Sequence, residues 1–164
     1  VSAAVLISVL NDIFIRFDNI ADHRGLEKIK TIGDSYMAAA GLPIPVPNHA
    51  ERAANMALDM LEVMDRFNEQ SDYQLNIRIG MSTGAAVAGV IGKRKFLYDL
   101  WGDVVNTASR MESHGVAGRI QITDSTRLQL GELFLLEKRG AIEVKGKGEM
   151  NTWFLNSHNG SVQA

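Results

Sequence analysis

The stretch LEKIKTIGDSYMAAA, residues 26–40, combines two short runs of strand-forming residues with a Gly-Asp pair between them. Gly33-Asp34 supplies the backbone freedom that a tight turn between antiparallel strands needs. The stretch therefore predicts a β-hairpin with strands at residues 26–32 and 35–40. Apolar residues at helical spacing precede it, which indicates that an amphipathic helix leads into the hairpin.

Helices and strand pairs alternate along the rest of the chain as well. Asn48 is expected to cap a second amphipathic helix through a capping box with Glu51, and Asp124 to cap a short helix that ends near residue 130. A further helix is expected at 104–113, and strands at 75–82, 85–91, 119–123, 135–138, 141–144 and 152–155. Strand pairs separated by helices favour an α+β fold, with helices packed on a mostly antiparallel sheet, over a doubly wound parallel sheet.

The composition is that of one globular domain. The chain has 164 residues, of which 46% are hydrophobic, enough for a core. A net charge of -2 gives no support for a nucleic-acid partner. The absence of cysteine excludes disulfides, zinc–thiolate sites and thiol catalysis. No apolar run is long enough to span a bilayer, so a membrane would be reached only through segments outside these residues.

A first group of candidate functional residues is Lys28, Lys30 and Asp34. Residues two apart in a strand face one side, so the two lysines are expected to point together. Asp34 at the tip of the hairpin is placed to reach a metal ion, although aspartate is also common in such turns for conformational reasons alone. The lysines taken alone fit a solvated face equally well.

A second group surrounds the helix expected at 104–113. Asn106 and Arg110 are four residues apart and project from one face. The planar fork of arginine suits phosphate oxygens, and Asp99, ahead of the helix, can accept a hydrogen bond from an exocyclic amine. An ordinary exposed helix face remains the alternative.

Two basic glycine segments, IGKRK at 91–95 and VKGKGE at 144–149, combine positive charge with close backbone approach, as phosphate sites do. Neither is a Walker A loop, because Gly92-Lys93 is followed by Arg94 rather than Ser or Thr. The sequence contains no G-x-G-x-x-G, so nothing supports dinucleotide binding. Its four histidines show no metal-ligand spacing.

Together and in this order, three segments resemble the class III nucleotide cyclase catalytic domain: EKIKTIGDSYMAAAGLP (27–43), YDLWGDVVNTASRMES (98–113) and IEVKGKGE (142–149). IRIGMSTGAAVAGVIG (77–92) is similar to the central hairpin of that family. The resemblance implies a ferredoxin-like palm with active sites at the interface of a head-to-tail dimer. It also implies lyase chemistry, the conversion of ATP or GTP to a 3′,5′-cyclic nucleotide and pyrophosphate.

The resemblance assigns the metal and purine contacts to three positions. Asp34 corresponds to one of two aspartates that hold two Mg²⁺ or Mn²⁺ ions. Lys30 and Asp99 correspond to the pair that reads the purine. Lysine only donates and a carboxylate only accepts, which is complementary to N1 and the 6-amino group of adenine, so the expected substrate is ATP.

The remaining contacts implied by the resemblance lie in the second half of the chain. Asn106 is similar to the residue that orients the ribose, Arg110 to the transition-state arginine on the α-phosphate, and Lys145 to the lysine on the terminal phosphates. Because one chain carries all these positions, the resemblance favours a homodimer with two equivalent sites. In such a dimer, Asp34 of one protomer is expected to act with five residues of its partner: Lys30, Asp99, Asn106, Arg110 and Lys145.

The family also has an F-x-D-I-x-G-F-T segment on its first strand, which these residues do not contain. That strand and the second metal aspartate are therefore expected upstream of residue 1. Residues 1–156 are expected to form an N-terminally incomplete catalytic domain, followed by a frayed polar tail at 157–164. A cytoplasmic location is expected, as the cytosolic part of a larger membrane or sensor protein.

Two alternative functions stay open. Guanylate cyclases usually have Glu and a smaller residue such as Cys in place of the purine-reading Lys and Asp. A catalytically inactive module that binds nucleotide for regulation or dimerisation would retain the same fold.

Overall fold

The computed structural model describes residues 2–91 and 97–160. It is an α+β fold, as the sequence predicts, and it divides into two compact units that are described separately. The first unit comprises Val1–Tyr73 and Ala88–Asp99, and the second comprises Gln74–Val87 and Leu100–Ala164.

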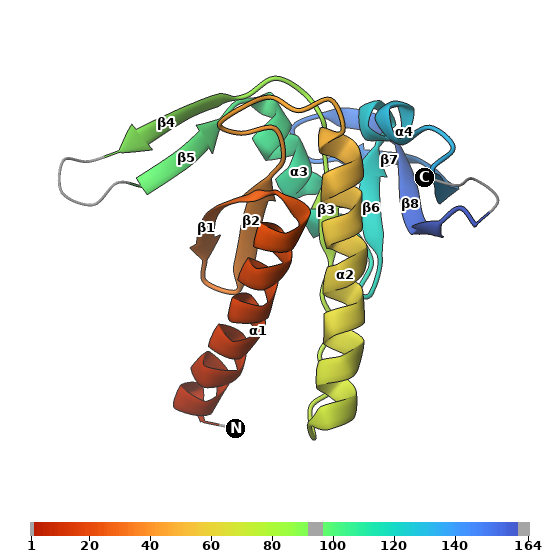
Figure 1. Cartoon of the computed structure of the whole chain (residues 1–164). Coiled ribbons are helices and arrows are strands. Elements are labelled where there is room, and N and C mark those ends of the chain that lie inside the picture. The colour runs from red at the N-terminus through yellow and green to blue at the C-terminus, as the bar shows by residue number, and fades with distance from the viewer. Residues whose placement is uncertain (1, 92–96, 161–164) are drawn as a thin grey trace. The chain divides into compact units, whose positions relative to one another are not determined.

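The first unit contains two long helices and a β-hairpin (Figure 1). Helix α1 (Ala3–Arg24) leads to strands β1 (Glu27–Ile32) and β2 (Ser35–Ala39), which pair antiparallel, and helix α2 (His49–Gln70) follows. The helix ahead of the predicted hairpin is thus confirmed. It ends where Gly25 adopts a left-handed conformation with φ of 77°, as glycine commonly does after a helix.

The core of this unit lies between the helices and the hairpin. Ala21, Leu26 and Met56 are buried together. Arg24 at the end of α1 forms two hydrogen bonds with Asp59 of α2, of 2.6 and 3.2 Å. A bidentate pair of this kind fixes the two helices side by side, as Figure 1 shows.

Asn48 precedes α2 as expected, but the predicted capping box is wrong. The side chain of Asn48 makes no capping hydrogen bond, and its Oδ1 accepts instead from Nε of Arg52 at 3.0 Å. The backbone of Asn48 has φ of -96° and ψ of 32°, which is not the extended conformation that aims a cap side chain at the first amides of a helix.

The second unit is built on a four-stranded sheet with the order β3-β6-β8-β7. Strand β3 (Ile79–Met81) runs parallel to β6 (Ile120–Thr123), whose four residues are all buried. Strand β8 (Gly148–His158) is antiparallel to both β6 and β7 (Phe134–Val144). The sheet is therefore mostly antiparallel, as predicted, and β3–β6 is its parallel pair.

Strand β7 joins two strands that the sequence predicted separately. A register shift between Lys138 and Gly140 accommodates the glycine without ending the strand. The strand predicted at 75–82, by contrast, is limited to β3. The predicted frayed tail is also wrong at its start, because Ser157 and His158 are the last two residues of β8 and pair with β7. Residues 161–164 of that tail lie outside the described residues.

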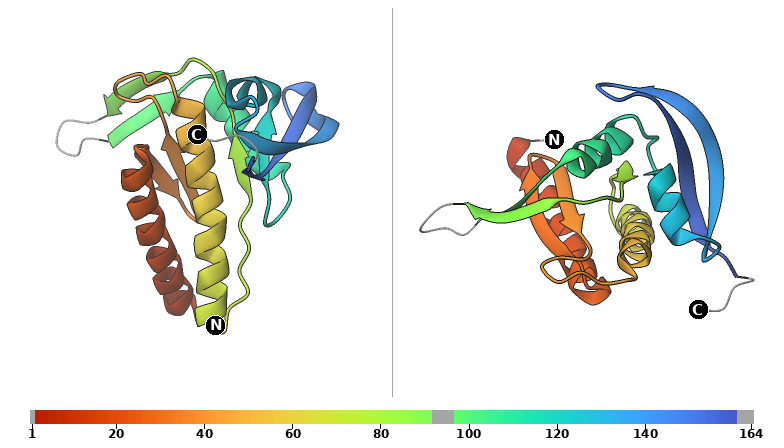
Figure 2. Two further views of the ribbon diagram at one scale, coloured as in Figure 1. Left: turned by 45° about the vertical axis from the view of Figure 1, so that its right-hand side comes forward. Right: turned by 90° about the horizontal axis from the view of Figure 1, so that it is seen from above.

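Two helices pack on this sheet. Helix α3 (Asp103–Ser113) contacts β3 and β6, and helix α4 (Asp124–Leu130) contacts β6 and β8 (Figure 2). Strands β4 (Val87–Ile91) and β5 (Leu97–Trp101) form a separate two-stranded sheet. Among the helices within residues 2–91 and 97–160, none combines the length and the apolar character needed to cross a membrane.

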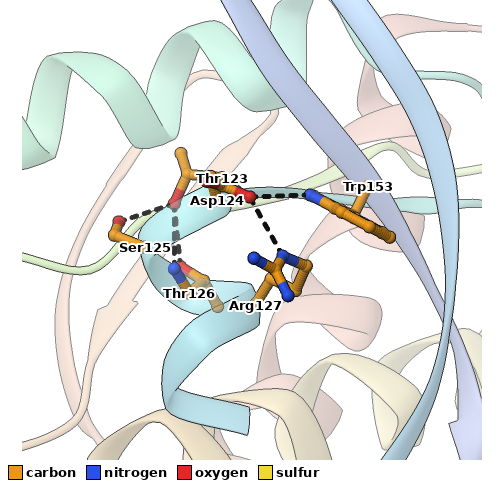
Figure 3. Close-up of polar contacts among 6 residues, drawn as sticks. All are labelled: Thr123, Asp124, Ser125, Thr126, Arg127 and Trp153. Atoms are coloured by element: carbon orange, nitrogen blue, oxygen red, sulfur yellow. Dashed lines mark hydrogen bonds and ion pairs between the residues drawn. The ribbon is translucent and has the colours of Figure 1, made fainter. Parts of the chain in front are cut away.

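The N-terminus of α4 differs from the prediction. Thr123, not Asp124, is the cap residue, and its hydroxyl accepts from the backbone N–H of Thr126 at 3.2 Å. Asp124 Oδ1 accepts from Nε of Arg127 and from Nε1 of Trp153, each at 3.0 Å (Figure 3). The two bonds lower the pKa of Asp124, and the bond from Trp153 ties α4 to β8.

Gly80 on β3 determines how closely α3 approaches the sheet. A Cβ at this position would lie 2.1 Å from the backbone nitrogen of Glu112 and 2.6 Å from the backbone oxygen of Ala108. A hydrogen-bonded helix backbone cannot move aside cheaply. We expect Gly80→Ala to lower the free energy of unfolding by about 3 kcal/mol, measured by urea denaturation.

Gly84→Ala is the matched control for this substitution. Its Cβ would meet the side chain of Val104 at 3.4 Å and no helix backbone. We expect a change of less than about 1 kcal/mol. Equal destabilisation by the two substitutions would contradict the role assigned to Gly80.

Candidate active site

Lys30 and Asp99, the predicted purine-reading pair, meet within the first unit. Nζ of Lys30 on β1 donates to Oδ2 of Asp99 on β5 at 2.8 Å. The lysine side chain is 36% exposed and the aspartate side chain 15% exposed, so the ammonium is the more open member of the pair. Because an ammonium carries several donors and a carboxylate several lone pairs, this single bond leaves hydrogen-bonding capacity for a ligand. The pair presents a donor and an acceptor side by side.

A β-bulge separates Lys28 from Lys30, and the period-two pattern did not predict it. The register with β2 shifts between the two lysines. Nζ of Lys28 lies 3.1 Å from the carboxylate of Asp18 on α1, so the two ammonium groups reach different elements. Asp18 also accepts from the hydroxyl of Tyr36 at 2.7 Å; burial, followed by this bond, raises the pKa of Tyr36. Lys28 therefore belongs to the contacts that hold the hairpin against α1.

Asp34 lies at the tip of the β1–β2 hairpin, directly after Gly33, whose φ is 57°. Its side chain is exposed and has no polar partner among residues 2–91 and 97–160. Mg²⁺ is typically bound by one or two carboxylates together with phosphate oxygens and water, and an exposed, unpaired carboxylate fits one such ligand position. Within the same ranges, no group of three or more His, Asp or Glu residues could hold a metal ion. Asp34 thus fits a metal ion that is shared with a nucleotide or another carboxylate.

Asn106 and Arg110 lie one turn apart on α3 in the second unit. Asn106 is exposed and Arg110 is half-buried. Neither side chain has a hydrogen-bond or ion-pair partner in the part of the chain that the structure describes. An amide and an uncompensated guanidinium on one helix face are suited to bind a sugar hydroxyl and a phosphate.

Lys145 begins the turn that joins β7 to β8. Its side chain is exposed and lacks a polar partner among the described residues. Gly146 and Gly148 have φ values of 78° and 75°, a conformation that residues with a Cβ rarely adopt. The basic glycine segment at 144–149 is therefore a tight turn that carries an exposed lysine. In the other segment, residues 92–95 lie outside the described residues.

A hollow of about 430 Å³ in the second unit contains none of the predicted site residues. Hydroxyl groups on its wall bond to one another and to the backbone. Thr83 Oγ1 and Thr126 Oγ1 are 2.8 Å apart, and the Ser125 hydroxyl donates to the Thr83 carbonyl at 3.1 Å. These bonds tie the loop after β3 to α4. We therefore assign these hydroxyl groups a structural role.

The structure thus joins Lys30 to Asp99 in one unit and places Asn106 near Arg110 in the other, with Asp34 and Lys145 on exposed turns. Sequence reasoning missed two residues that contact the Lys145 turn, Asp103 and His114. The sequence does hold a pattern that could have identified them, because Asp103 and His114 lie at helical spacing on the same face of α3 as Arg110.

Comparison with known proteins identifies the family to which this fold belongs. The model of the adenylate and guanylate cyclase catalytic domain family matches residues 1–157. An adenylate cyclase of Mycobacterium tuberculosis is 47% identical over 152 residues, covering 93% of this chain and 34% of that protein. A membrane guanylyl cyclase of Dictyostelium discoideum is 44% identical over 154 residues, covering 94% of this chain and 10% of that protein.

Solved structures agree with these matches. The guanylate cyclase domain from Catenaria anguillulae, crystallised in complex with GTP, superposes with a TM-score of 0.91 at 41% identity. The match covers 97% of this chain and 87% of that one. The chain spans no more than about a third of the length of the curated relatives described above.

Proposed function

Because the chain belongs to the adenylate and guanylate cyclase catalytic domain family, we propose that it converts ATP to 3′,5′-cyclic AMP and pyrophosphate. The observation that carries the choice of ATP is the pair of Lys30 and Asp99, 2.8 Å apart. Adenine presents an acceptor at N1 beside a donor at the 6-amino group, and the pair offers the matching donor and acceptor. Guanine in the same pose would set its N1–H against the lysine and its O6 against the carboxylate.

In the proposed reaction, the ribose 3′-hydroxyl gives its proton to solvent and its oxygen attacks the α-phosphorus in line, while pyrophosphate leaves with the bonding electrons of the broken P–O bond. Asn106 orients the ribose, and Arg110 offsets the charge that grows on the α-phosphate oxygens. Lys145 binds the terminal phosphates and so favours departure of pyrophosphate. Asp34 would hold a divalent metal ion, which would supply Lewis-acid stabilisation of phosphate charge and would lower the pKa of the 3′-hydroxyl.

We infer further that two copies of the chain form the active unit head to tail. Four of the candidate side chains have no polar partner among the described residues: Asp34, Asn106, Arg110 and Lys145. All of them except Asn106 carry a charge. Uncompensated charges on one chain are expected where a second copy and a charged substrate complete the site. Asp34 of one protomer would then act with five residues of its partner: Lys30, Asp99, Asn106, Arg110 and Lys145.

The ATP preference is tested by the double substitution Lys30→Glu with Asp99→Cys. It removes the donor at N1 and the acceptor at the 6-amino group, so we expect the ratio of ATP to GTP turnover to fall at least roughly a hundredfold. The measurement is cyclic AMP and cyclic GMP formed from an equimolar mixture of ATP and GTP. Lys138→Glu, a charge reversal at an exposed lysine on β7, is the control and should leave the ratio unchanged.

GTP is the second candidate substrate, because guanylyl cyclases are among the similar proteins. An unaltered ratio in the double variant would show that Lys30 and Asp99 do not read the base. Nucleotide binding without any cyclic product in the unsubstituted protein would favour the inactive-module alternative.

A further inference from the structure

Four residues form a stripe along one side of α3. Asp103, Asn106, Arg110 and His114 follow one another at intervals of three, four and four residues, so they share a helix face. Asp103 is the first residue of the helix and His114 directly follows its last. At the α-helical rise, the stripe is roughly 16 Å long. Asn106 and Arg110 lie between its two ends.

The β7–β8 turn contacts both ends of this stripe. The ammonium of Lys147 forms an ion pair with Asp103 Oδ1. The backbone N–H of Lys145 donates to Nε2 of His114 at 3.4 Å, a long hydrogen bond. The Lys147 side chain is only 20% exposed, so it lies along the protein surface rather than in solvent. The turn that carries Lys145 is therefore held beside the face that carries Arg110, and Figure 2 shows the β7–β8 hairpin next to α3.

Side-chain hydrogen bonds fix the strand behind the turn as well. Nη1 of Arg139 on β7 donates to the backbone oxygen of His114 at 2.7 Å and to the side-chain oxygen of Gln121. Gln121 is fully buried, and its Nε2 donates to the backbone oxygen of Met111 at 2.9 Å. The C-terminal end of α3 is thus bound to β6 and β7. At the N-terminal end of α3, the contact of the turn is the Lys147–Asp103 pair.

We propose that Asp103 and Lys147 are positioning residues that hold the Lys145 ammonium and the Arg110 guanidinium in register for one polyphosphate. The inference rests on the proposed cyclase function. A backbone hydrogen bond from the N–H of Lys147 to the oxygen of Val144, at 2.9 Å, closes the turn. The Lys147–Asp103 ion pair adds the side-chain contact that orients the closed turn against the N-terminal end of α3. A misplacement of about 1 Å can cost as much as a hundredfold in rate. An exposed ion pair contributes little to stability, so loss of the pair should change the rate far more than the melting temperature.

The experiment is a cycle of variants in the full chain. We expect Lys147→Met to lower kcat roughly tenfold with a smaller change in KM, and the charge exchange Asp103→Lys with Lys147→Asp to restore kcat to within about threefold of the unsubstituted protein. In a Lys145→Met background, Lys147→Met should have no further effect, because it acts through Lys145. Lys138→Met, which neutralises an exposed lysine on β7, is the matched control and should leave kcat unchanged.

Two results would overturn the proposal. One is a charge exchange that fails to restore kcat, which would indicate that Lys147 touches phosphate directly. The other is an equal loss from Lys147→Met in both backgrounds.

A second readout does not need turnover. Inorganic tripolyphosphate is titrated while the amide resonance of Lys145 is followed by NMR. We expect Lys147→Met to weaken the response at Lys145 at least roughly fivefold, and Lys138→Met to leave it unchanged. An unchanged response in Lys147→Met would overturn the positioning role. A weakened response in a protein that forms no cyclic nucleotide would support the positioning role and contradict the cyclase function alone.

Discussion

Replacement of Arg110 by alanine is expected to lower the rate of cyclic nucleotide formation roughly 10²–10³-fold without unfolding the protein. The guanidinium is half-buried on α3 and has no polar partner among the described residues, so its removal breaks no hydrogen bond or ion pair among them. In the proposed mechanism, what is lost is a preorganised charge at the α-phosphate, where negative charge grows in the transition state. The measurement is the initial rate at saturating ATP, accompanied by a thermal melt followed by circular dichroism.

Arg66→Ala provides the control for the loss of a surface arginine. Arg66 is exposed on α2 and pairs with Glu62 one turn away. We expect this variant to retain full activity. If Arg110→Ala retained more than about half of the rate of the unsubstituted protein, the transition-state role would be wrong and Arg110 would be an ordinary surface residue.

Asp34→Ala is expected to lower the rate by a similar factor, roughly 10²–10³-fold, and to raise the concentration of Mn²⁺ or Mg²⁺ needed for half-maximal activity. The carboxylate lies exposed at the hairpin tip without a polar partner among the described residues, so alanine there would remove the proposed metal ligand and no hydrogen bond or ion pair among them. Titration of each metal at fixed ATP measures the effect.

Asp72→Ala is the matched control, because Asp72 is another exposed aspartate outside the helices and strands of the first unit. Its metal titration should coincide with that of the unsubstituted protein. If the Asp34→Ala titration also coincided, Asp34 would be a turn residue and not a metal ligand.

The elements of this fold that local pattern determines could be predicted from the sequence. Gly33-Asp34 between two strand-forming runs specifies the β1–β2 hairpin, and the apolar periodicity specifies α1, α2 and α3. Features set by tertiary contact could not. The bulge beside Lys30, the continuity of β7 through Gly140 and the cap at Thr123 depend on which strand or helix lies opposite.

The candidate site shows the same division. Residue type and spacing singled out Lys30, Asp99, Asn106 and Arg110 as candidates, and the roles proposed for them come from the family resemblance. The pairing of Lys30 with Asp99 joins residues 69 positions apart, and that of Lys147 with Asp103 joins residues 44 apart. No local sequence pattern predicts contacts between residues so far apart in the chain, because such contacts form only when the strands and helices pack together.

The central claim, that each site is built from two copies of the chain, is tested most directly by mixing the Asp34→Ala and Arg110→Ala variants. In a mixed dimer one site carries both substitutions and the other carries neither. An equal mixture contains about half mixed dimers, so we predict recovery of about a quarter of the activity of the unsubstituted protein. Cyclic AMP formation that stays at the average of the two separate variants would contradict the shared site.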